Sequence, residues 1–271
     1  MLSWIVRKQI EAARARSSET NELDPERIKQ VVYEALDKGK LETIPSPTTR
    51  PLVSNLRYLQ LAFNEDWAQA RRILPSIPRS DRILVEAGTP YIKREGLAGI
   101  RSMRARWPGH IVADLKASDG GEEEAVMVHT VGATAATVLG SSPSETLDLF
   151  IAACAKLGMA SMIDMLGVAD PLHVILHLKQ PPDVIVLHRG RDEEGTRGKV
   201  IQYRHVNRLR SKYDALISAA GGVNLREARS AIFNGASIVV VNIVSPGKSW
   251  EGIPANADVA KIARDFLATI E

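Results

Sequence analysis

Short apolar runs alternate with amphipathic segments along most of the chain. From about Leu59 onward, the segments between the runs carry apolar residues at the spacing of an α-helix. Continuous apolar runs are typical of strands that are buried on both faces, as in a parallel sheet covered by helices on each side. We identify eight such runs: YLQLAF, RILVEAG, HIVADLK, AATVLG, ASMIDMLG, DVIVLH, ALISAAGG and SIVVVNIV.

Eight alternating strand and helix units predict an α/β protein, and specifically a (β/α)8 (TIM) barrel in preference to an open sheet. The last segment, NADVAKIARDFLATIE, has the spacing of a helix that would complete the barrel. In such barrels the catalytic side chains lie at the carboxyl ends of the strands. The polar residues that end the runs are therefore the candidates for chemistry.

The first fifty residues have a different pattern. SWIVRKQIEAARAR has helical spacing, and DPERIKQVVYEALDKGK begins with Asp24 as an N-cap and Pro25 at the first helical position. We predict an N-terminal helical extension, residues 1–50, followed by a catalytic barrel, residues 51–271. Packing or an oligomer contact is the favoured role of the extension, with membrane or partner binding as the alternative.

Composition and charge exclude several functional classes. The chain has 35 Lys and Arg residues against 32 Asp and Glu residues, and a net charge of +3 is too small to indicate a nucleic-acid-binding surface. The single cysteine, Cys154, lies between alanines in an expected helix, so we predict a buried thiol and a reducing, cytoplasmic environment. No apolar run approaches the length of a membrane span. We therefore expect no nucleic-acid partner and no membrane partner.

Polar residues of complementary kinds end the predicted strands. A single aspartate at a strand end is more often a helix N-cap than a catalyst. Carboxylates, a lysine and an imidazole that converge on one barrel mouth would shift each other's pKa values unless a cation or a substrate joined them. We therefore favour a functional site over separate structural roles. The residues are Asn64, Glu86, Asp114 with Lys116, Gly140 with Ser141, Asp164, His188, Gly221 with Gly222, and Asn242.

The residue types suggest a magnesium ion and a phosphate. Glu86 and Asp114 end adjacent strands, and two carboxylates that leave positions for water and substrate suit Mg²⁺. Lys116 lies on the same side of its strand as Asp114 and can donate to carboxylates or to substrate oxygens. Gly221 and Gly222 could simply permit a tight turn, but their position after the seventh strand favours a cradle for a phosphate.

Several motifs carry a family resemblance. ADLKASD has the Asp-x-Lys-x-x-Asp pattern of the orotidine 5'-monophosphate decarboxylase suprafamily. In addition, VEAGTPYIKREG, IVADLKASDGG, DMLGVADP, VIVLHRGRDEE and SAAGGVN resemble 3-hexulose-6-phosphate synthase and 3-keto-L-gulonate-6-phosphate decarboxylase. The motifs occur in the family's order from about residue 59 to residue 271, which makes the resemblance stronger than any one pattern.

The resemblance implies a role for each site residue. It implies that Mg²⁺ is held by Glu86 and Asp114, binds two neighbouring oxygens of a sugar phosphate, and stabilises an enediolate. Lys116 would contact the developing oxyanion, and His188 would transfer the proton. Asp164 would bind or orient the substrate.

It further implies that Asp119 reaches across a twofold interface into the neighbouring subunit's site. We therefore expect a homodimer with shared active sites and a phosphorylated sugar as its substrate.

The resemblance leaves two reactions open. Asp164 in DMLGV and the AAGG sequence favour the synthase, which interconverts formaldehyde plus ribulose 5-phosphate and 3-hexulose 6-phosphate. Arg191 in HRGRD instead resembles an arginine of the decarboxylase that assists protonation of the intermediate. The leading prediction is an aldehyde-lyase, and a carboxy-lyase is the alternative. The metal-independent orotidine branch is less expected, because Glu86 and HRGRD resemble the metal-dependent enzymes.

Two positions depart from the family's pattern. Asn64 stands where the first strand normally ends in aspartate, and Asp66 could compensate only if the strand end were shifted. At the eighth strand, Asn242 and Ile243 replace the usual Gly-Gly or Gly-Arg pair, although Lys248 could supply a positive charge for phosphate. These departures motivate a third hypothesis, a diverged barrel that binds a phosphorylated metabolite without the standard activity.

Overall fold

The computed structural model describes Gln30 and residues 51–271. The chain divides into two units, residues 1–48 and residues 49–271. The expected N-terminal helical extension, residues 1–50, lies outside the described residues apart from Gln30. Its helices and its boundary with the barrel therefore stay predictions.

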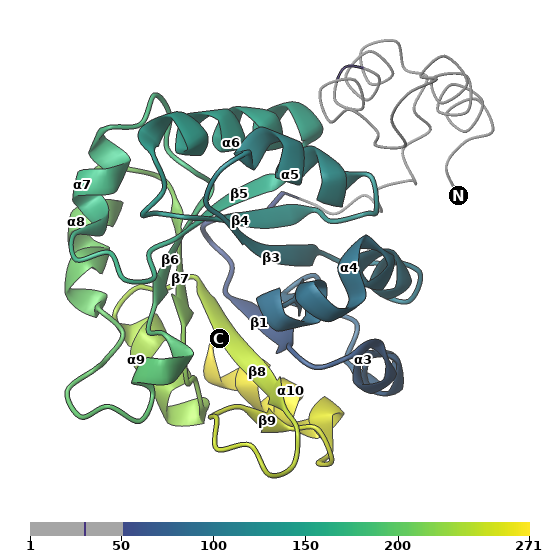
Figure 1. Ribbon diagram of the computed structural model, residues 1–271. Helices are drawn as coiled ribbons and strands as arrows, with labels where there is room; N and C mark the ends of the chain where they lie inside the picture. The colour runs from purple at the N-terminus through teal and green to yellow at the C-terminus, as the bar shows by residue number, and fades with distance from the viewer. Residues whose placement is uncertain (1–29, 31–50) are drawn as a thin grey trace, which may run out of the picture. The chain divides into compact units, whose positions relative to one another are not determined.

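The second unit is a closed barrel of eight parallel strands (Figure 1). Each strand pairs with the next one along the chain, and β8 pairs with β1 to close the sheet. The predicted (β/α)8 barrel is therefore confirmed. The strands are β1 (Tyr58–Phe63), β2 (Ile83–Ala87), β3 (Ile111–Ala117), β4 (Ala135–Leu139), β5 (Ala160–Asp164), β6 (Val184–His188), β7 (Leu216–Ala220) and β8 (Ile238–Val244).

Helices surround the barrel and connect its strands (Figure 1). Several begin at side-chain caps; Asn224, for example, accepts a hydrogen bond from the Glu227 backbone N–H at 3.0 Å. Cys154 is buried in α6, as expected. The helices are α3 (Trp67–Ile73), α4 (Thr89–Arg104), α5 (Gly121–His129), α6 (Ser144–Leu157), α7 (Pro171–Leu176), α8 (Val206–Arg210), α9 (Leu225–Phe233) and α10 (Val259–Thr269).

Short irregular elements lie between the helices and strands. Three single 3-10 turns are η1 (Leu74–Ser76), η2 (Arg191–Glu193) and η3 (Tyr203–His205). A two-residue strand, β9 (Ile253–Pro254), pairs with the end of β8 and was not predicted, because two residues are too few to show a strand pattern. The turn η2 lies in the loop after β6, and β9 follows the loop after β8.

Every second residue of each strand points into the barrel and fills its interior. Ala62, Leu84, Val112, Met162 and Val240 belong to this buried cluster. Side chains alternate between the two faces of a strand, so the residue two positions further along also points inward. That parity directs Asn64, Glu86, Asp114, Asp164 and Asn242 into the barrel mouth.

In the part of the chain that the structure describes, no helix is long and apolar enough to cross a membrane.

Candidate active site

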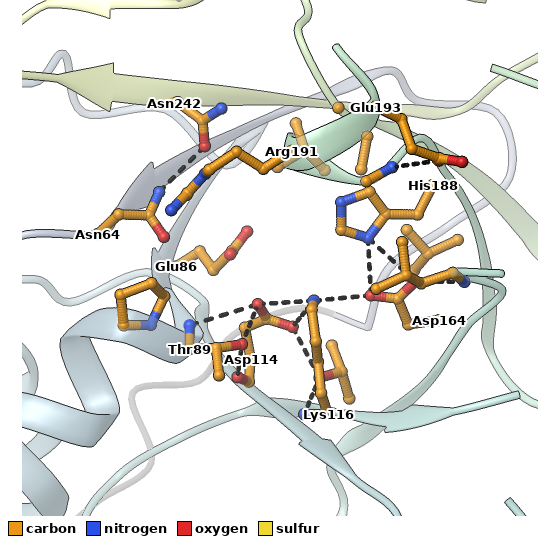
Figure 2. Close-up of a pocket in the computed structure, with 18 of the residues that line it drawn as sticks. Asn64, Glu86, Thr89, Asp114, Lys116, Asp164, His188, Arg191, Glu193 and Asn242 are labelled. Carbon is orange, nitrogen blue, oxygen red and sulfur yellow. Dashed lines mark hydrogen bonds and ion pairs between the residues drawn. The ribbon is translucent and has the colours of Figure 1, made fainter. Parts of the chain in front are cut away.

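A cavity of about 510 Å³ opens at the carboxyl ends of the barrel strands (Figure 2). The strand-end parity brings most of the predicted site residues into its lining. Five consecutive residues of the loop after β6, 190–194, complete one side of the mouth. The predicted residues that line the cavity are Asn64, Glu86, Asp114, Lys116, Asp164, His188, Arg191, Gly221 and Asn242.

Three predicted residues are not part of this lining. Asp119 is exposed after β3, and its carboxylate accepts a hydrogen bond from the Gly120 backbone N–H at 2.9 Å. Gly222 lies beside Gly221 but outside the lining, and Lys248 is an exposed residue of the loop after β8. The predicted cross-subunit role of Asp119 concerns a neighbouring chain and stays a prediction.

Lys116 joins two carboxylates at the centre of the site (Figure 2). Its Nζ lies 2.9 Å from each carboxylate oxygen of Asp114 and 2.7 Å from Oδ2 of Asp164. Burial opposes the charge on Lys116, but the two carboxylates outweigh it and raise the pKa of the ammonium group. Lys116 therefore carries a permanent positive charge in the barrel mouth.

The backbone at Lys116 is held in an unusual conformation. Its φ is +50°, in the left-handed region that side-chain-bearing residues seldom adopt. The pairing of β3 with β4 changes register between Ala113 and Ala117, and the Lys116 N–H donates to Oγ1 of Thr137 at 2.9 Å. The ammonium group of the same residue contacts Asp114, and such backbone conformations cluster at functional sites.

Asp164 fixes the orientation of His188. The Nδ1 atom of His188 lies 2.8 Å from Oδ2 of Asp164. A carboxylate can only accept, so Nδ1 carries the proton and Nε2 is left for the cavity. Burial opposes charge on both groups. The contact with Asp164 nevertheless raises the pKa of His188, while His188 and Lys116 hold the pKa of Asp164 well below its ordinary value.

Glu86 and Asp114 are two acidic groups that repel each other in the buried part of the site. Burial and the nearby Asp114 raise the pKa of Glu86 to about 7, although Gln60 donates a hydrogen bond to its carboxylate.

Among the residues described, no group of three or more His, Cys, Asp and Glu side chains is arranged to hold a metal ion. Two carboxylates are nevertheless a usual protein contribution to Mg²⁺, which keeps water and substrate oxygens as its other ligands. The donor set therefore fits the predicted ion, which would relieve the repulsion between the two acids.

The raised pKa of Glu86 makes a stability prediction for the metal-free protein. Ionisation of Glu86 is penalised in the folded state, so the penalty is complete above pH 7 and vanishes as the pH falls toward 4.5. This rise in the pKa of Glu86 corresponds to about 3 kcal/mol in the free energy of unfolding. We expect Glu86→Gln to be more stable than the natural chain at pH 8 by up to about this amount, and the difference to disappear near pH 5.

Urea unfolding at the two pH values, with EDTA present, measures this difference. The exposed Glu145→Gln in α6 is a matched control that should show a small and pH-independent change. Saturating Mg²⁺ at pH 8 is expected to stabilise the natural chain more than Glu86→Gln. Equal stability of the two proteins at pH 8 without metal would show that Glu86 is not destabilised by burial.

The two departures at the first and eighth strands meet in space. Nδ2 of Asn64 donates to Oδ1 of Asn242 at 3.0 Å, and both side chains line the cavity (Figure 2). The Asn64–Asn242 pair itself carries no charge. Asp66 does not compensate for the missing charge, because its carboxylate caps α3 by accepting from the Gln69 N–H at 2.9 Å.

The glycine pair after β7 is required by a close backbone contact. A Cβ at Gly221 would lie 1.9 Å from the carbonyl oxygen of Arg189, and Gly221 and Gly222 both have positive φ. Nη2 of Arg189 also donates to the carbonyl oxygen of Gly221 at 2.9 Å. The tight-turn interpretation therefore accounts for these glycines without any ligand.

Polar residues of the cavity that were missed from the sequence include three on or beside the strands, Gln60, Thr89 and Thr137, and three on the loop after β6, Asp192, Glu193 and Glu194. Gln60 lies within an apolar run, and Thr89 begins α4 and donates to Oδ2 of Asp114 at 2.8 Å. Thr137 donates to Oδ1 of Asp114 at 2.9 Å. Gly140 and Ser141 were considered for β4, but neither lines the cavity. Counting strand parity backward from the end of each run would have found Gln60 and Thr137.

Comparisons with known proteins agree with this geometry. A family model described as orotidine 5'-phosphate decarboxylase / HUMPS family matches residues 57–242. The bifunctional enzyme Fae/Hps of Methanothrix thermoacetophila is 35% identical over 216 residues, which are 79% of this chain and 53% of that protein. Its counterpart in Methanosarcina barkeri is 37% identical over 215 residues, 79% of this chain and 52% of that protein. The chain thus spans about half the length of the curated relatives it matches.

Solved structures show the same fold over nearly their whole length. The 3-hexulose-6-phosphate synthase of Salmonella typhimurium has a TM-score of 0.68 and 26% identity, covering 79% of this chain and 98% of that chain. The 3-keto-L-gulonate-6-phosphate decarboxylase of Vibrio cholerae has a TM-score of 0.60 and 19% identity, covering 80% of this chain and 98% of that chain. The second likeness supports the fold alone.

Proposed function

Because the chain belongs to the orotidine 5'-phosphate decarboxylase / HUMPS family, we propose that it is a carbon–carbon lyase of the 3-hexulose-6-phosphate synthase type. It would join formaldehyde to ribulose 5-phosphate and split 3-hexulose 6-phosphate in the reverse direction. The observation that carries the proposal is the continuous contact from Asp114 through Lys116 and Asp164 to His188 in the barrel mouth. Similarity to the Salmonella typhimurium synthase at 26% identity supports the same reaction.

The arrangement of charge suits this chemistry. When the carbon–carbon bond of the hexulose phosphate breaks, the hydroxymethyl group gives its hydroxyl proton to water and leaves as formaldehyde, and the electron pair of the broken bond passes into an enediolate of the five-carbon sugar. Lys116 places a fixed positive charge beside the developing oxyanion. Nε2 of His188 then gives its proton to the carbon that lost formaldehyde, and in the synthetic direction it removes that proton. Asp164 holds the imidazole in position throughout.

Magnesium is part of the proposal. Glu86 and Asp114 are the two carboxylates that would hold it, and the bound ion would supply positive charge to two neighbouring substrate oxygens. Glu86 is the ligand whose charge is most penalised without a cation, because it is buried and faces Asp114. Gln60 orients that carboxylate from β1.

A homodimer with shared sites also belongs to the proposal. Asp119 follows the Asp-x-Lys-x-x spacing from Asp114 but lies outside the cavity of its own chain. Its exposed carboxylate contacts the Gly120 backbone N–H within its own chain. We propose that this exposed carboxylate, on the loop before α5, serves the site of a neighbouring subunit.

Formaldehyde release tests the reaction directly. We expect the purified chain to release formaldehyde from 3-hexulose 6-phosphate, to lose the activity in EDTA, and to regain it with Mg²⁺. A folded, magnesium-loaded protein that releases no formaldehyde would overturn the proposal. If that protein still bound ribulose 5-phosphate, the third hypothesis, a barrel that binds a phosphorylated metabolite without turnover, would replace it.

One observation favours a second candidate reaction. Arg191 lines the same cavity, opposite Lys116 across the mouth (Figure 2), where it could assist protonation after loss of carbon dioxide. The candidate substrate is 3-keto-L-gulonate 6-phosphate. Carbon dioxide release from this substrate with a higher kcat/KM than formaldehyde release from the hexulose phosphate would establish the carboxy-lyase instead.

A further inference from the structure

Lys116 uses all of its ammonium protons inside the protein. Nζ lies 2.9 Å from Oδ1 and from Oδ2 of Asp114, and 2.7 Å from Oδ2 of Asp164 (Figure 2). An ammonium group has three donors, and these three contacts engage them. Unless one of the contacts opens, Lys116 therefore has no donor for a substrate oxygen.

The carboxylate of Asp114 is engaged to the same degree. Oδ1 accepts from the Thr137 hydroxyl at 2.9 Å and from Lys116. Oδ2 accepts from Lys116 and lies 2.8 Å from the Thr89 hydroxyl and 3.4 Å from the Thr89 N–H. A carboxylate offers about four acceptor positions. Asp114 therefore has no position left for a metal ion while these donors stay in place.

Glu86 differs from Asp114 in this respect. Gln60 contacts Oε2 of Glu86, and among the described residues no hydrogen bond engages Oε1. Glu86 can therefore face a cation as it stands, whereas Asp114 can do so only after it loses a donor. Lys116 is the donor that must leave, because a cation at Asp114 would meet the positive charge of the ammonium group at close range.

Asp114 is the carboxylate that Lys116 can leave at the smaller cost. The contact with Asp164 is the shorter one, and the Asp164 side chain is 2% exposed, against 11% for Asp114. A buried carboxylate that loses its partner is strongly destabilising. Asp164 is also fixed by the N–H of Leu166, which donates to its Oδ1 at 3.0 Å. Asp114, in contrast, would keep both threonine contacts and gain the cation.

We propose that Lys116 is a switch between two states of the site, and that it exchanges Asp114 for a substrate oxygen while it stays on Asp164. The proposal rests on the proposed function, in which Asp114 helps to hold Mg²⁺. The exchange frees an oxygen of Asp114 for the cation and an ammonium proton of Lys116 for the substrate, so every charge keeps a partner. Cation and substrate then strengthen each other's binding, because both depend on the same movement of Lys116.

Calorimetric titration with Mg²⁺ alone tests the competition for Asp114. We expect Lys116→Met to bind Mg²⁺ about 10- to 100-fold more tightly than the natural chain, because no charged hydrogen bonds to Asp114 have to be broken. Lys116→Arg keeps the charge and offers a carboxylate a pair of donors, so its affinity should not exceed that of the natural chain. Arg191→Met is the matched control, because it removes a positive charge from the cavity lining. Its gain should stay within about threefold.

A second neutral variant and a second measurement guard against loss of folding. Lys116→Gln repeats the titration with a side chain whose amide can still donate to a buried carboxylate. Urea unfolding with and without Mg²⁺ reports the same affinity, since a cation that binds the folded state raises the free energy of unfolding. This rise should be larger in Lys116→Met and Lys116→Gln than in the natural chain.

Ribulose 5-phosphate tests the substrate side of the exchange. In the natural chain, a saturating concentration of this ligand should lower the dissociation constant for Mg²⁺ about tenfold or more. In Lys116→Met the decrease should be smaller, by about the factor that the binding of Mg²⁺ alone has gained. An equal decrease in both proteins would show that Lys116 does not respond to the ligand, and our proposal would be wrong.

The remaining outcomes separate the exchange from the proposed reaction. Equal Mg²⁺ affinities of Lys116→Met and Arg191→Met would overturn the exchange, as would the absence of measurable Mg²⁺ binding in all of these proteins. If the natural chain released formaldehyde in either case, the proposed reaction would stand without the exchange. Tighter Mg²⁺ binding by Lys116→Met, with no formaldehyde release from the natural chain, contradicts only the proposed reaction.

Discussion

Replacing Lys116 with methionine is expected to lower kcat/KM for formaldehyde release about 10³-fold. Its Nζ lies within 2.9 Å of Asp114 and 2.7 Å of Asp164, so one ammonium group contacts both the proposed magnesium ligand and the partner of His188. Methionine removes the fixed charge that faces the oxyanion. It also removes one of the two cations that keep Asp164 ionised beside His188. The loss should fall mainly on kcat, since charge develops during the reaction.

The same substitution is expected to destabilise the protein by about 3–5 kcal/mol, because it leaves buried carboxylates without their partner. Lys116→Arg separates the two effects. It keeps a positive charge between Asp114 and Asp164, and so most of the stability, but a wider guanidinium cannot reproduce the compact ammonium contact with substrate. Lys261→Met is the control, because Lys261 makes an exposed ion pair with Asp265 at 3.0 Å on α10. Full activity in folded Lys116→Met would exclude an oxyanion role for Lys116.

The barrel and the position of its mouth could be predicted because their signals are local. Each apolar run is a strand, and its length is readable without knowledge of its neighbours. Strand parity then directs Glu86, Asp114 and Asp164 to one end of the barrel. The closure of the sheet into a barrel could be predicted because the strand and helix unit repeats eight times. The Asp-x-Lys spacing in ADLKASD, in turn, placed Asp114 and Lys116 on the same side.

The contacts between side chains from different strands could not be predicted in the same way. The last polar residue of an apolar run was taken as the inward one, so Gly140 and Ser141 were chosen where Thr137 points inward. The positive φ of Lys116 depends on the register change between β3 and β4, which is a property of their pairing. The run alone contains no sign of that change.

Loop residues were the least predictable part of the site. Lys248 was predicted to supply a positive charge for phosphate in the loop after the eighth strand, and this stays a prediction; the structure shows that Lys248 and Arg191 both contact the ring of Trp250. This grouping joins the loops after β6 and β8, and no spacing along the chain relates them. The role of Asp66 was likewise decided by the place where α3 begins. Loop conformation thus determines where these charged side chains lie, while the strands determine the position of the cavity.

Replacing His188 with glutamine is expected to lower kcat for formaldehyde release about 10²- to 10⁴-fold, the usual range for loss of a general acid or base. The side chain of glutamine can still contact Asp164 but cannot transfer a proton. His173→Gln makes the same substitution at an exposed position on α7, where it should have no effect on turnover. Steady-state rates with 3-hexulose 6-phosphate provide the comparison.

The pH dependence of the rate, compared between the natural chain and a variant of Asp164, tests whether His188 is the proton donor. Asp164 raises the pKa of His188, so Asp164→Asn should lower that pKa toward or below the ordinary value of about 6.5. Cleavage needs the protonated imidazole, and its rate falls as the pH rises through this pKa. In Asp164→Asn the falling limb of the pH–rate profile for cleavage should therefore move to lower pH. The rising limb of the profile for synthesis should move to lower pH as well. If neither limb moved, although kcat had dropped, the pH-dependent group would be another residue, and Asp164 would act on the substrate directly.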